Sequence, residues 1–260
     1  MKKSFKIRLL PTEEQEILMW KSIGCSRFAY NWALNRCNEL YKQGAKYNMS
    51  NIRKEFTQLK KEEEFKWLNE VSNKVTQESM RNLDKAFKSF FRKQNKFPKY
   101  KAKRNKQSYS TNNQNGTVYL SEDYKYISLP KIKNIKIKMH RKFDGVIKTV
   151  TVSKECDETY YVSILVEENI EAKPKSNNSV GIDLGIKSYI VDSNAKRIDN
   201  PKHLSRSLLK LAIEQRKLSH MKKGGKNRNK QRIKVARLHR RIRNQRNDFL
   251  HKLSSKYINE

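Results

Sequence analysis

The excess of basic over acidic residues is the feature of this sequence that most limits what it can fold into. Across 260 residues, 59 Lys and Arg accompany only 26 Asp and Glu, which leaves a formal net charge of +33. A compact state with so much charge of one sign repels itself unless a polyanion neutralises it. An acidic small molecule needs only a local pocket, so we expect no small-molecule substrate and infer that the partner is nucleic acid.

The rest of the composition disfavours other classes of basic protein. Hydrophobic residues make up 36% of the chain, including 12 Tyr and 10 Phe, whereas chains that cannot fold are poor in them. No apolar run approaches the roughly 18 residues of a membrane span, and no lipidation signal or basic amphipathic helix with a continuous apolar face indicates a membrane partner. The first eight residues place charges where a signal peptide needs an apolar stretch. We therefore expect a cytoplasmic, nucleoid-associated protein.

Cysteine and histidine show no metal-binding pattern. The three cysteines, Cys25, Cys37 and Cys156, cannot all pair, and no two have the Cys-x-x-Cys spacing. The five histidines lack a His-x-x-x-His spacing. The sequence thus predicts neither a zinc site nor a disulfide framework.

Hydrophobic periodicity predicts an α+β protein that begins with a strand and continues with helices. Ser4–Leu10 alternates apolar with polar residues, and Thr12 followed by Gln15 is a capping-box pattern that opens a helix. Helical periodicity predicts helices over residues 12–23, 27–42, 50–61 and from 72 to about 93. Alternating and β-branched runs predict strands over residues 132–139, 147–152 and 159–166.

A basic loop is predicted between the helical and strand-rich parts, over residues 96–114. Lys96–Lys106 contains six bases and no acid, and a Ser/Asn/Gln tract follows to Gln114. Basic residues with interleaved aromatic rings are typical of surfaces that bind a nucleic-acid backbone and stack on its bases, although a disordered basic linker has the same composition. The predicted contacts are Lys99, Tyr100, Lys101, Lys103 and Arg104, with Phe97 and Tyr109 as further aromatic candidates.

Asp183 is the residue that most strongly suggests catalysis. It is the central residue of Gly181-Ile182-Asp183-Leu184-Gly185, which follows a linker-like stretch at residues 171–179. A carboxylate on a buried strand is costly unless it is paired or holds a cation, and flanking glycines would let a phosphate backbone approach. The pattern fits the first metal-binding aspartate of an RNase H-like nuclease, but it also fits an ordinary strand that ends in a turn.

The C-terminal part predicts two long helices, over residues 204–222 and 230–259. Between residues 202 and 247, 17 Lys and Arg accompany one acid, Glu214, whereas solvated helices normally mix both signs. Apolar residues such as Val235 and Ile242 recur on one face, so the opposite face is predicted to meet phosphates, with a solvated lysine-rich face as the alternative. The predicted nucleic-acid contacts here are Lys226, Arg228, Arg237, Arg240 and Arg241.

A series of motifs, in order along nearly the whole chain, resembles the transposon-encoded TnpB (OrfB) proteins, which are related to type V CRISPR effectors. These motifs are Phe5–Thr12, Arg27–Leu34, Leu83–Phe91, Leu129–Ile132, Gly181–Ile186, Lys234–Arg240 and Asn244–Leu253. The resemblance implies a helical recognition domain (12–94) inserted in a small wedge-type β-barrel (1–11 and 95–170). A linker (171–179) would then lead to a RuvC-like α/β domain with long basic helices (180–260).

The resemblance also implies a function, that of an RNA-guided DNA endonuclease of a mobile element. Its partners would be a guide RNA from the transposon end and target double-stranded DNA, with pairing reading the sequence and protein reading backbone shape. Recognition-domain residues read a short motif beside the target in this family. Lys74 and Gln77 carry donors suited to a DNA groove and are the residues we expect to do so.

This sequence departs from the pattern of the family's catalytic site. Three carboxylates hold Mg²⁺ in the family, and Asp183 matches the first of them. The strand with the second acid would follow the helix that ends near Leu253, whereas the sequence stops at Glu260, too early and without an apolar run. The resemblance therefore implies an incomplete RuvC-like domain and Mg²⁺ site, and a truncated nuclease that binds without cutting. The sequence therefore predicts neither the presence nor the absence of enzymatic activity.

Two other functions fit the same residues. One is a nuclease-dead, RNA-guided DNA-binding repressor. The other is a generic basic RNA-binding protein in which Asp183 is incidental.

Overall fold

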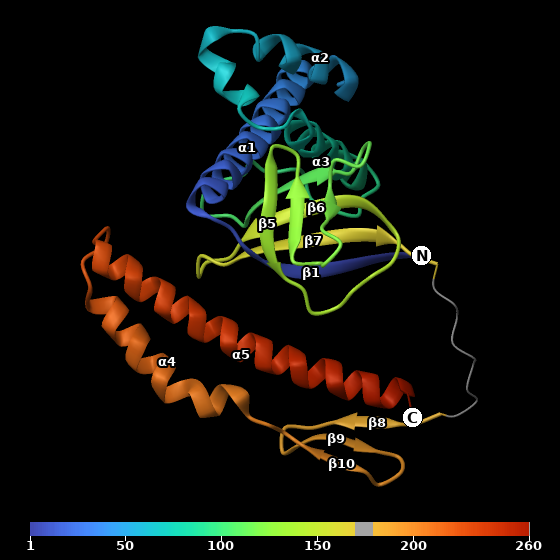
Figure 1. Ribbon diagram of the computed structural model, residues 1–260, viewed down its shortest axis with the longest axis vertical. Helices are drawn as coiled ribbons and strands as arrows, with labels where there is room; N and C mark the ends of the chain where they lie inside the picture. The colour runs from blue at the N-terminus through green and yellow to red at the C-terminus, as the bar shows by residue number, and fades with distance from the viewer. Residues whose placement is uncertain (170–178, 260) are drawn as a thin grey trace. The chain divides into compact units, whose positions relative to one another are not determined.

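The computed structural model describes residues 1–169 and 179–259, apart from the side chain of Arg206. The chain forms two compact units (Figure 1). Unit 1 contains residues 1–155 and 159–170, and unit 2 contains residues 156–158 and 171–260. The predicted linker at residues 171–179 lies almost entirely outside the described residues. Helices and strands occur in both units, as the predicted α+β class requires.

Unit 1 is built on a seven-stranded antiparallel sheet with the order β2-β6-β7-β1-β5-β4-β3. Its strands are β1 (Lys2–Leu10), β2 (Gln107–Asn112), β3 (Tyr119–Leu120), β4 (Tyr126–Leu129), β5 (Ile132–Lys138), β6 (Val146–Lys154) and β7 (Tyr160–Glu167). The central strand β1 pairs Phe5 with Ile164 and Ile7 with Val162. The alternation predicted for β1 is confirmed, because Phe5, Ile7 and Leu9 are all buried in the core of the sheet.

Helices fill the interval between β1 and β2. They are α1 (Glu13–Lys42), α2 (Met49–Leu59), the 3₁₀ helix η1 (Glu63–Asn69) and α3 (Asn73–Phe91). The capping box is confirmed: Gln15 N–H donates to Thr12 Oγ1 at 3.3 Å, and Thr12 N–H donates to Gln15 Oε1 at 3.0 Å. The Gln15 amide also donates to the Lys133 carbonyl at 2.9 Å, which attaches the start of α1 to the sheet.

The prediction of two separate helices over residues 12–42 is wrong. A single 30-residue helix, α1, continues through Gly24 (Figure 1). Gly24 lies at the predicted break, and a glycine inside a helix costs about 1 kcal/mol relative to alanine. The residues on either side of it, Ile23, Cys25 and Ser26, are buried, and the Ser79 hydroxyl of α3 bonds to the Ser26 carbonyl. This tertiary packing outweighs the local preference.

The loop predicted up to Gln114 is also partly wrong. Residues Gln107–Asn112 form β2, an edge strand paired with β6. Tyr109 pairs with Val152 and is buried in the sheet core, so it cannot stack on a nucleic-acid base. The sequence Gln-Ser-Tyr-Ser-Thr-Asn is rich in hydroxyl groups and lacks the apolar alternation that predicts a strand. One face of β2 is nevertheless buried, and Tyr109 and Thr111 lie on it.

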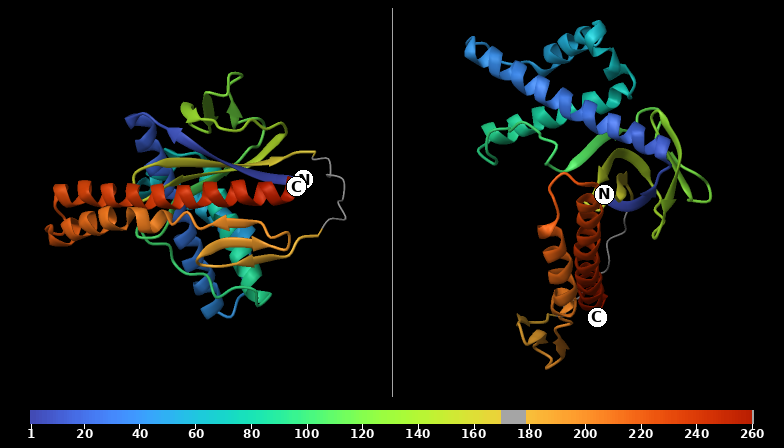
Figure 2. Two further views of the ribbon diagram at one scale, coloured as in Figure 1. Left: turned by 90° about the horizontal axis from the view of Figure 1, so that it is seen from below. Right: turned by 90° about the vertical axis from the view of Figure 1, so that its left-hand side faces the viewer.

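Unit 2 contains a three-stranded antiparallel sheet with the order β10-β9-β8, followed by two long helices. The elements are β8 (Ile182–Leu184), β9 (Ser188–Asp192), β10 (Arg197–Asp199), α4 (His203–His220) and α5 (Lys226–Asn259). The two predicted helices are confirmed, and they lie side by side in both views of Figure 2. Leu211 packs between them against Val235 and Ile242, and the Gln231 amide donates to the Glu214 carboxylate at 2.6 Å. None of the helices within the described residues is long and apolar enough to cross a bilayer.

Candidate nucleic-acid interface

Asp183 occupies the middle of β8, as the sequence suggests, but its surroundings differ from the expectation. The prediction of a buried strand is wrong, because all three residues of β8 are exposed. β8 is an edge strand and is paired only with β9, where Asp183 lies opposite Val191. Side chains opposite each other share a face of a sheet, so Asp183 lies on the same face as the exposed Val191.

The two glycines that flank Asp183 have different structural roles. A Cβ on Gly185 would lie 2.8 Å from the Ser188 carbonyl oxygen, so the tight turn between β8 and β9 requires a glycine there. A Cβ on Gly181 would lie 3.6 Å from its nearest neighbour, Ser193 Cβ, which is an ordinary contact. The turn geometry therefore accounts for Gly185, and sterics do not require Gly181.

The buried acid of this sheet is Asp192, which the sequence did not single out. Its carboxylate accepts hydrogen bonds from the Asn194 and Lys196 backbone N–H groups and from the Tyr257 hydroxyl at 3.0 Å. Desolvation would raise the pKa of Asp192, but these donors outweigh it and hold that pKa below its ordinary value. Asp192 thus fastens the turn after β9 to α5. The bond to Tyr257 spans 65 residues, so no local pattern could have revealed it.

Within the described residues, no group of three or more His, Cys, Asp and Glu side chains could hold a metal ion. Asp183 and Asp192 occupy neighbouring strands but are not paired in the register, since Asp192 lies opposite Ile182. Asp192 is committed to the turn and to Tyr257. Asp183 is therefore an exposed carboxylate that belongs to no such cluster among these residues.

The basic segment before β2 is attached to α1. The Asn31 side chain brackets the Lys101 backbone, donating to its carbonyl at 2.9 Å and accepting from its N–H at 2.8 Å. The Tyr100 hydroxyl bonds to the side chains of Asn35 and Asn38, each at 3.3 Å. A disordered linker is excluded for this part of the segment. The Tyr100 ring remains 51% exposed, and Lys99, Lys103 and Arg104 are also exposed.

The two residues predicted to read DNA lie on the first turns of α3. The Lys74 ammonium donates to the Gln114 carbonyl at 2.9 Å and to the Thr117 hydroxyl at 3.0 Å, so it holds the loop after β2 in place. Gln77 is exposed. The structure leaves Gln77 available to a ligand, whereas Lys74 already has protein partners.

Helix α5 separates its bases from its apolar residues. Lys226, Arg237 and Arg241 are exposed, and their spacing of 11 and 4 residues places them on one face of the helix. The buried residues Gln231, Val235, Ile242 and Leu253 lie on the opposite face. Arg240 instead pairs with buried Asp157 at 2.6 Å, and Arg228 is half-buried. Three of the five predicted contacts on α5 thus form an exposed basic face.

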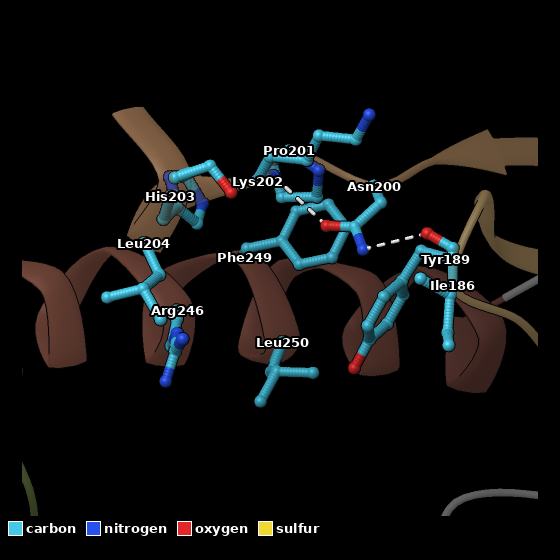
Figure 3. A pocket seen from close by; sticks show the side chains of 11 residues that line it. Ile186, Tyr189, Asn200, Pro201, Lys202, His203, Leu204, Arg246, Phe249 and Leu250 are labelled. Carbon is cyan, nitrogen blue, oxygen red and sulfur yellow. Dashed lines mark hydrogen bonds between the residues drawn. The ribbon is translucent and has the colours of Figure 1, made fainter. Parts of the chain in front are cut away.

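A cavity of about 490 Å³ lies where β9, α4 and α5 meet (Figure 3). The rings of Tyr189 and Phe249 meet edge to face there, 5.1 Å apart, and Lys202, His203 and Arg246 line the same cavity. The Asn200 side chain bridges the Ile186 carbonyl and the Lys202 N–H. Aromatic rings beside cations suit an anionic ligand with a flat ring. No local sequence pattern indicates this cavity, because its lining residues are up to 64 positions apart.

Two family profiles match the chain. A profile described as "Probable transposase" matches residues 146–260, and a profile described as a helix-turn-helix domain matches residues 1–46. The second match covers β1 and α1, where the structure has a strand and one unbroken helix instead of two helices joined by a turn.

Two curated relatives align with nearly the whole chain. A Streptomyces pristinaespiralis protein named "Putative RNA-guided DNA endonuclease" is 35% identical over 261 residues, which cover 100% of this chain and 65% of that protein. An Escherichia coli (strain K12) protein named "Putative RNA-guided DNA endonuclease InsQ" is 33% identical over 254 residues, which cover 97% of this chain and 62% of that protein. The chain therefore spans less than two thirds of the length of either relative.

Among solved structures, a CRISPR-Cas12f ternary complex aligns with 95% of this chain and 60% of its own chain, with a TM-score of 0.40 and 12% identity. The family assignment depends on the sequence matches: the two profiles cover residues 1–46 and 146–260, and the two relatives align with 97% or more of the chain. The chain belongs to the TnpB (OrfB) family of probable transposases.

Proposed function

We propose that this chain takes part in RNA-guided recognition of DNA, binding a guide RNA from a transposon end and a target duplex in the nucleoid. The observation that carries the proposal is the match, over 97% or more of the chain, to two proteins named as RNA-guided DNA endonucleases. The net charge of +33 and the exposed basic face of α5 support it, because a guide–target duplex must be held through its phosphates.

Each part of the fold has a role in this proposal. The seven-stranded sheet of unit 1 acts as the wedge, and the helices at residues 12–94 form the recognition domain. Exposed Gln77 on α3 faces the motif beside the target, while Lys74 positions the loop after β2. Residues 180–260 form the start of a RuvC-like domain, since an antiparallel sheet with an aspartate on its first strand precedes the helices.

The metal site is the part of the family function that these residues fit least well. Mg²⁺ takes near-octahedral oxygen ligands, and cleavage of a phosphodiester by two metals needs several carboxylates in fixed geometry. Asp183 is exposed on an edge strand, and no acidic cluster surrounds it among the described residues. Asp183 alone does not fit such a centre, so we derive no cleavage step. We propose that the 260-residue chain binds its target without cutting it, as a DNA-binding repressor would.

Two readouts on the purified full chain test the proposal. Sequencing of the RNA that co-purifies should yield one defined species that includes a transposon end, because guided recognition needs a single scaffold RNA. A mixture of unrelated cellular RNAs would instead indicate a generic RNA-binding protein.

The second readout concerns cleavage. The chain loaded with its RNA is mixed with Mg²⁺ and matched duplex DNA, and Asp183→Ala is the paired variant. We expect binding without cleavage for both proteins. Guide-dependent cleavage that Asp183→Ala abolishes would show that the chain has a working nuclease centre, contrary to the proposal.

A further inference from the structure

A small basic cavity lies within unit 1, between α1 and the chain that leads into β2. Its volume is about 290 Å³, and its polar lining includes Ser26, Arg27, Lys101, Asn105, Lys106 and Ser108. Three of these residues are cations, and none of the described residues that line the cavity is acidic. Cations that gather in a hollow without a carboxylate are electrostatically unfavourable in the free protein, so the cavity suits an anion.

Arg27 lies on α1 and uses few of its hydrogen-bond donors within the described residues. It is half-buried, and its Nη1 donates to Gln107 Oε1 at 3.0 Å, the one hydrogen bond it makes to the described residues. The Gln107 amide is in turn fixed by the Lys103 and Asn105 carbonyls. A guanidinium has five donors, so this arrangement orients Arg27 and leaves most of its donors for a ligand.

Lys101 is held in place through its backbone, while its ammonium pairs with no carboxylate among the described residues. Asn31 brackets the Lys101 backbone, and the ammonium lies over the Tyr30 ring, 4.1 Å from its centroid. Burial lowers the pKa of Lys101. The ring offsets only part of the desolvation, because a cation–π contact is weaker than an ion pair with a phosphate.

The residue before Lys101 adds a second kind of contact. The Tyr100 hydroxyl is fixed by Asn35 and Asn38, yet the side chain is 51% exposed. Tyr100 does not itself line the cavity, but it directly precedes Lys101, and consecutive Cα atoms are about 3.8 Å apart. Single-stranded nucleic acids are bound by this combination of cations that follow the backbone and aromatic rings on which bases stack.

We propose that the cavity holds a backbone phosphate of single-stranded RNA and that the Tyr100 ring stacks on the neighbouring base. Arg27 and Lys101 contact the phosphate oxygens, and Asn31 acts as a positioning residue through the Lys101 backbone. The site depends on the nucleic-acid partner in the proposed function but not on guiding or cleavage.

The test measures binding of the full chain to a fluorescein-labelled oligouridylate by anisotropy over a series of KCl concentrations. Removing one phosphate contact to a single strand should reduce the slope of log K against log [KCl] by about 0.7, so Arg27→Gln and Lys101→Gln should each do so. Lys54→Gln, at an exposed position on α2, is the matched control and should keep the wild-type slope. Arg27→Gln gives an independent readout in case Lys101→Gln, whose ammonium packs on Tyr30, fails to fold.

The aromatic contact is tested with a second pair of variants at constant salt. Tyr100→Leu should weaken binding by about five- to a hundredfold, the usual range for one stacked base. Tyr41→Leu, at an 83% exposed position on α1, should leave the affinity for the oligouridylate unchanged.

Three results would overturn the proposal. The first is an unchanged salt slope in both charge variants. The second is stabilisation of the wild-type chain by inorganic phosphate alone, with no change in the RNA slope, which would mean that the cavity takes a free anion. The third is an equal loss of binding in Tyr100→Leu and Tyr41→Leu. Because the RNA here is unguided, the expected slope changes would support the site even if guided recognition of DNA failed.

Discussion

The two compact units differ in how completely they bury their apolar residues. In unit 1, β1 and its neighbours contribute Ile7, Val162 and Ile164, all fully buried in a core that spans the sheet. In unit 2, Ile186 is 90% exposed and Leu209 is 81% exposed, and the buried core contains few residues. Since buried apolar area is the main source of folding free energy, most of the stability lies in unit 1.

This difference affects the candidate sites in the two units. Lys101 and Tyr100 are fixed by hydrogen bonds to α1, which itself packs in a dense core. Asp183 lies on a three-residue strand whose apolar neighbours Ile182 and Leu184 are exposed, so backbone pairing with β9 is its main support. Preorganisation of side chains therefore favours binding through unit 1 over chemistry at Asp183.

The largest expected effect contrasts one apolar residue from each unit. Ile7→Ala should lower the free energy of unfolding by about 2–5 kcal/mol, because Ile7 is fully buried and the deletion leaves a cavity. Leu209→Ala should change it by less than about 0.5 kcal/mol, since Leu209 is exposed. Urea unfolding followed by far-UV circular dichroism measures both values. Equal losses would show that the exposed residues of unit 2 contribute as much stability as the core of the sheet.

A smaller effect is expected from two glycines, one in each unit. Gly145 has φ +142°, and a Cβ there would lie 2.5 Å from the Glu167 carbonyl oxygen, so Gly145→Ala should cost more than about 1 kcal/mol. Gly181 has room for a Cβ, and Gly181→Ala should be neutral or stabilise by up to about 1 kcal/mol. Thermal unfolding of the two variants measures both changes in stability. A destabilised Gly181→Ala would indicate a role for that glycine beyond local sterics.

The smallest effect concerns the pH dependence of the sheet in unit 2. The hydrogen bonds from Lys196, Tyr257 and Asn194 lower the pKa of Asp192, so folding favours its charged form. The resulting stabilisation is present above the ordinary pKa of 3.8 and is lost as the pH falls through the lower folded value. The protection factors of the β9 amides against hydrogen exchange should therefore fall below that pH in the wild type and not in Asp192→Asn. An equal fall in both proteins would show that another group controls the sheet.

Local patterns were enough to predict most strands and helices. The alternation in Ser4–Leu10 and the capping box at Thr12 depend on residues close in sequence, and the structure has both features. The predictions for residues 12–42 and 96–114 were partly wrong for the opposite reason, because packing of α1 against α3 and pairing of β2 with β6 decide the conformation there. Long-range contacts therefore overruled local propensity at these two places.

The candidate sites could be predicted only in part. The basic composition of residues 96–106 indicated nucleic acid, but it could not show that Asn31, 70 positions away, clamps Lys101. Asp183 was found from its glycine-flanked strand, whereas its exposure depends on β8 being an edge strand. Composition identifies the ligand class, and tertiary contacts determine which residues are available to meet it.

The most direct test of the central claim is a comparison of two duplexes at one salt concentration. The full chain, loaded with the RNA that co-purifies with it, is titrated with a DNA duplex matched to the guide and with a duplex mismatched beside the target-adjacent motif. RNA-guided recognition predicts clearly tighter binding to the matched duplex, because base pairing supplies the sequence specificity. Equal affinities that fall with the same salt slope would contradict it and show that the chain binds nucleic acid through its charge alone.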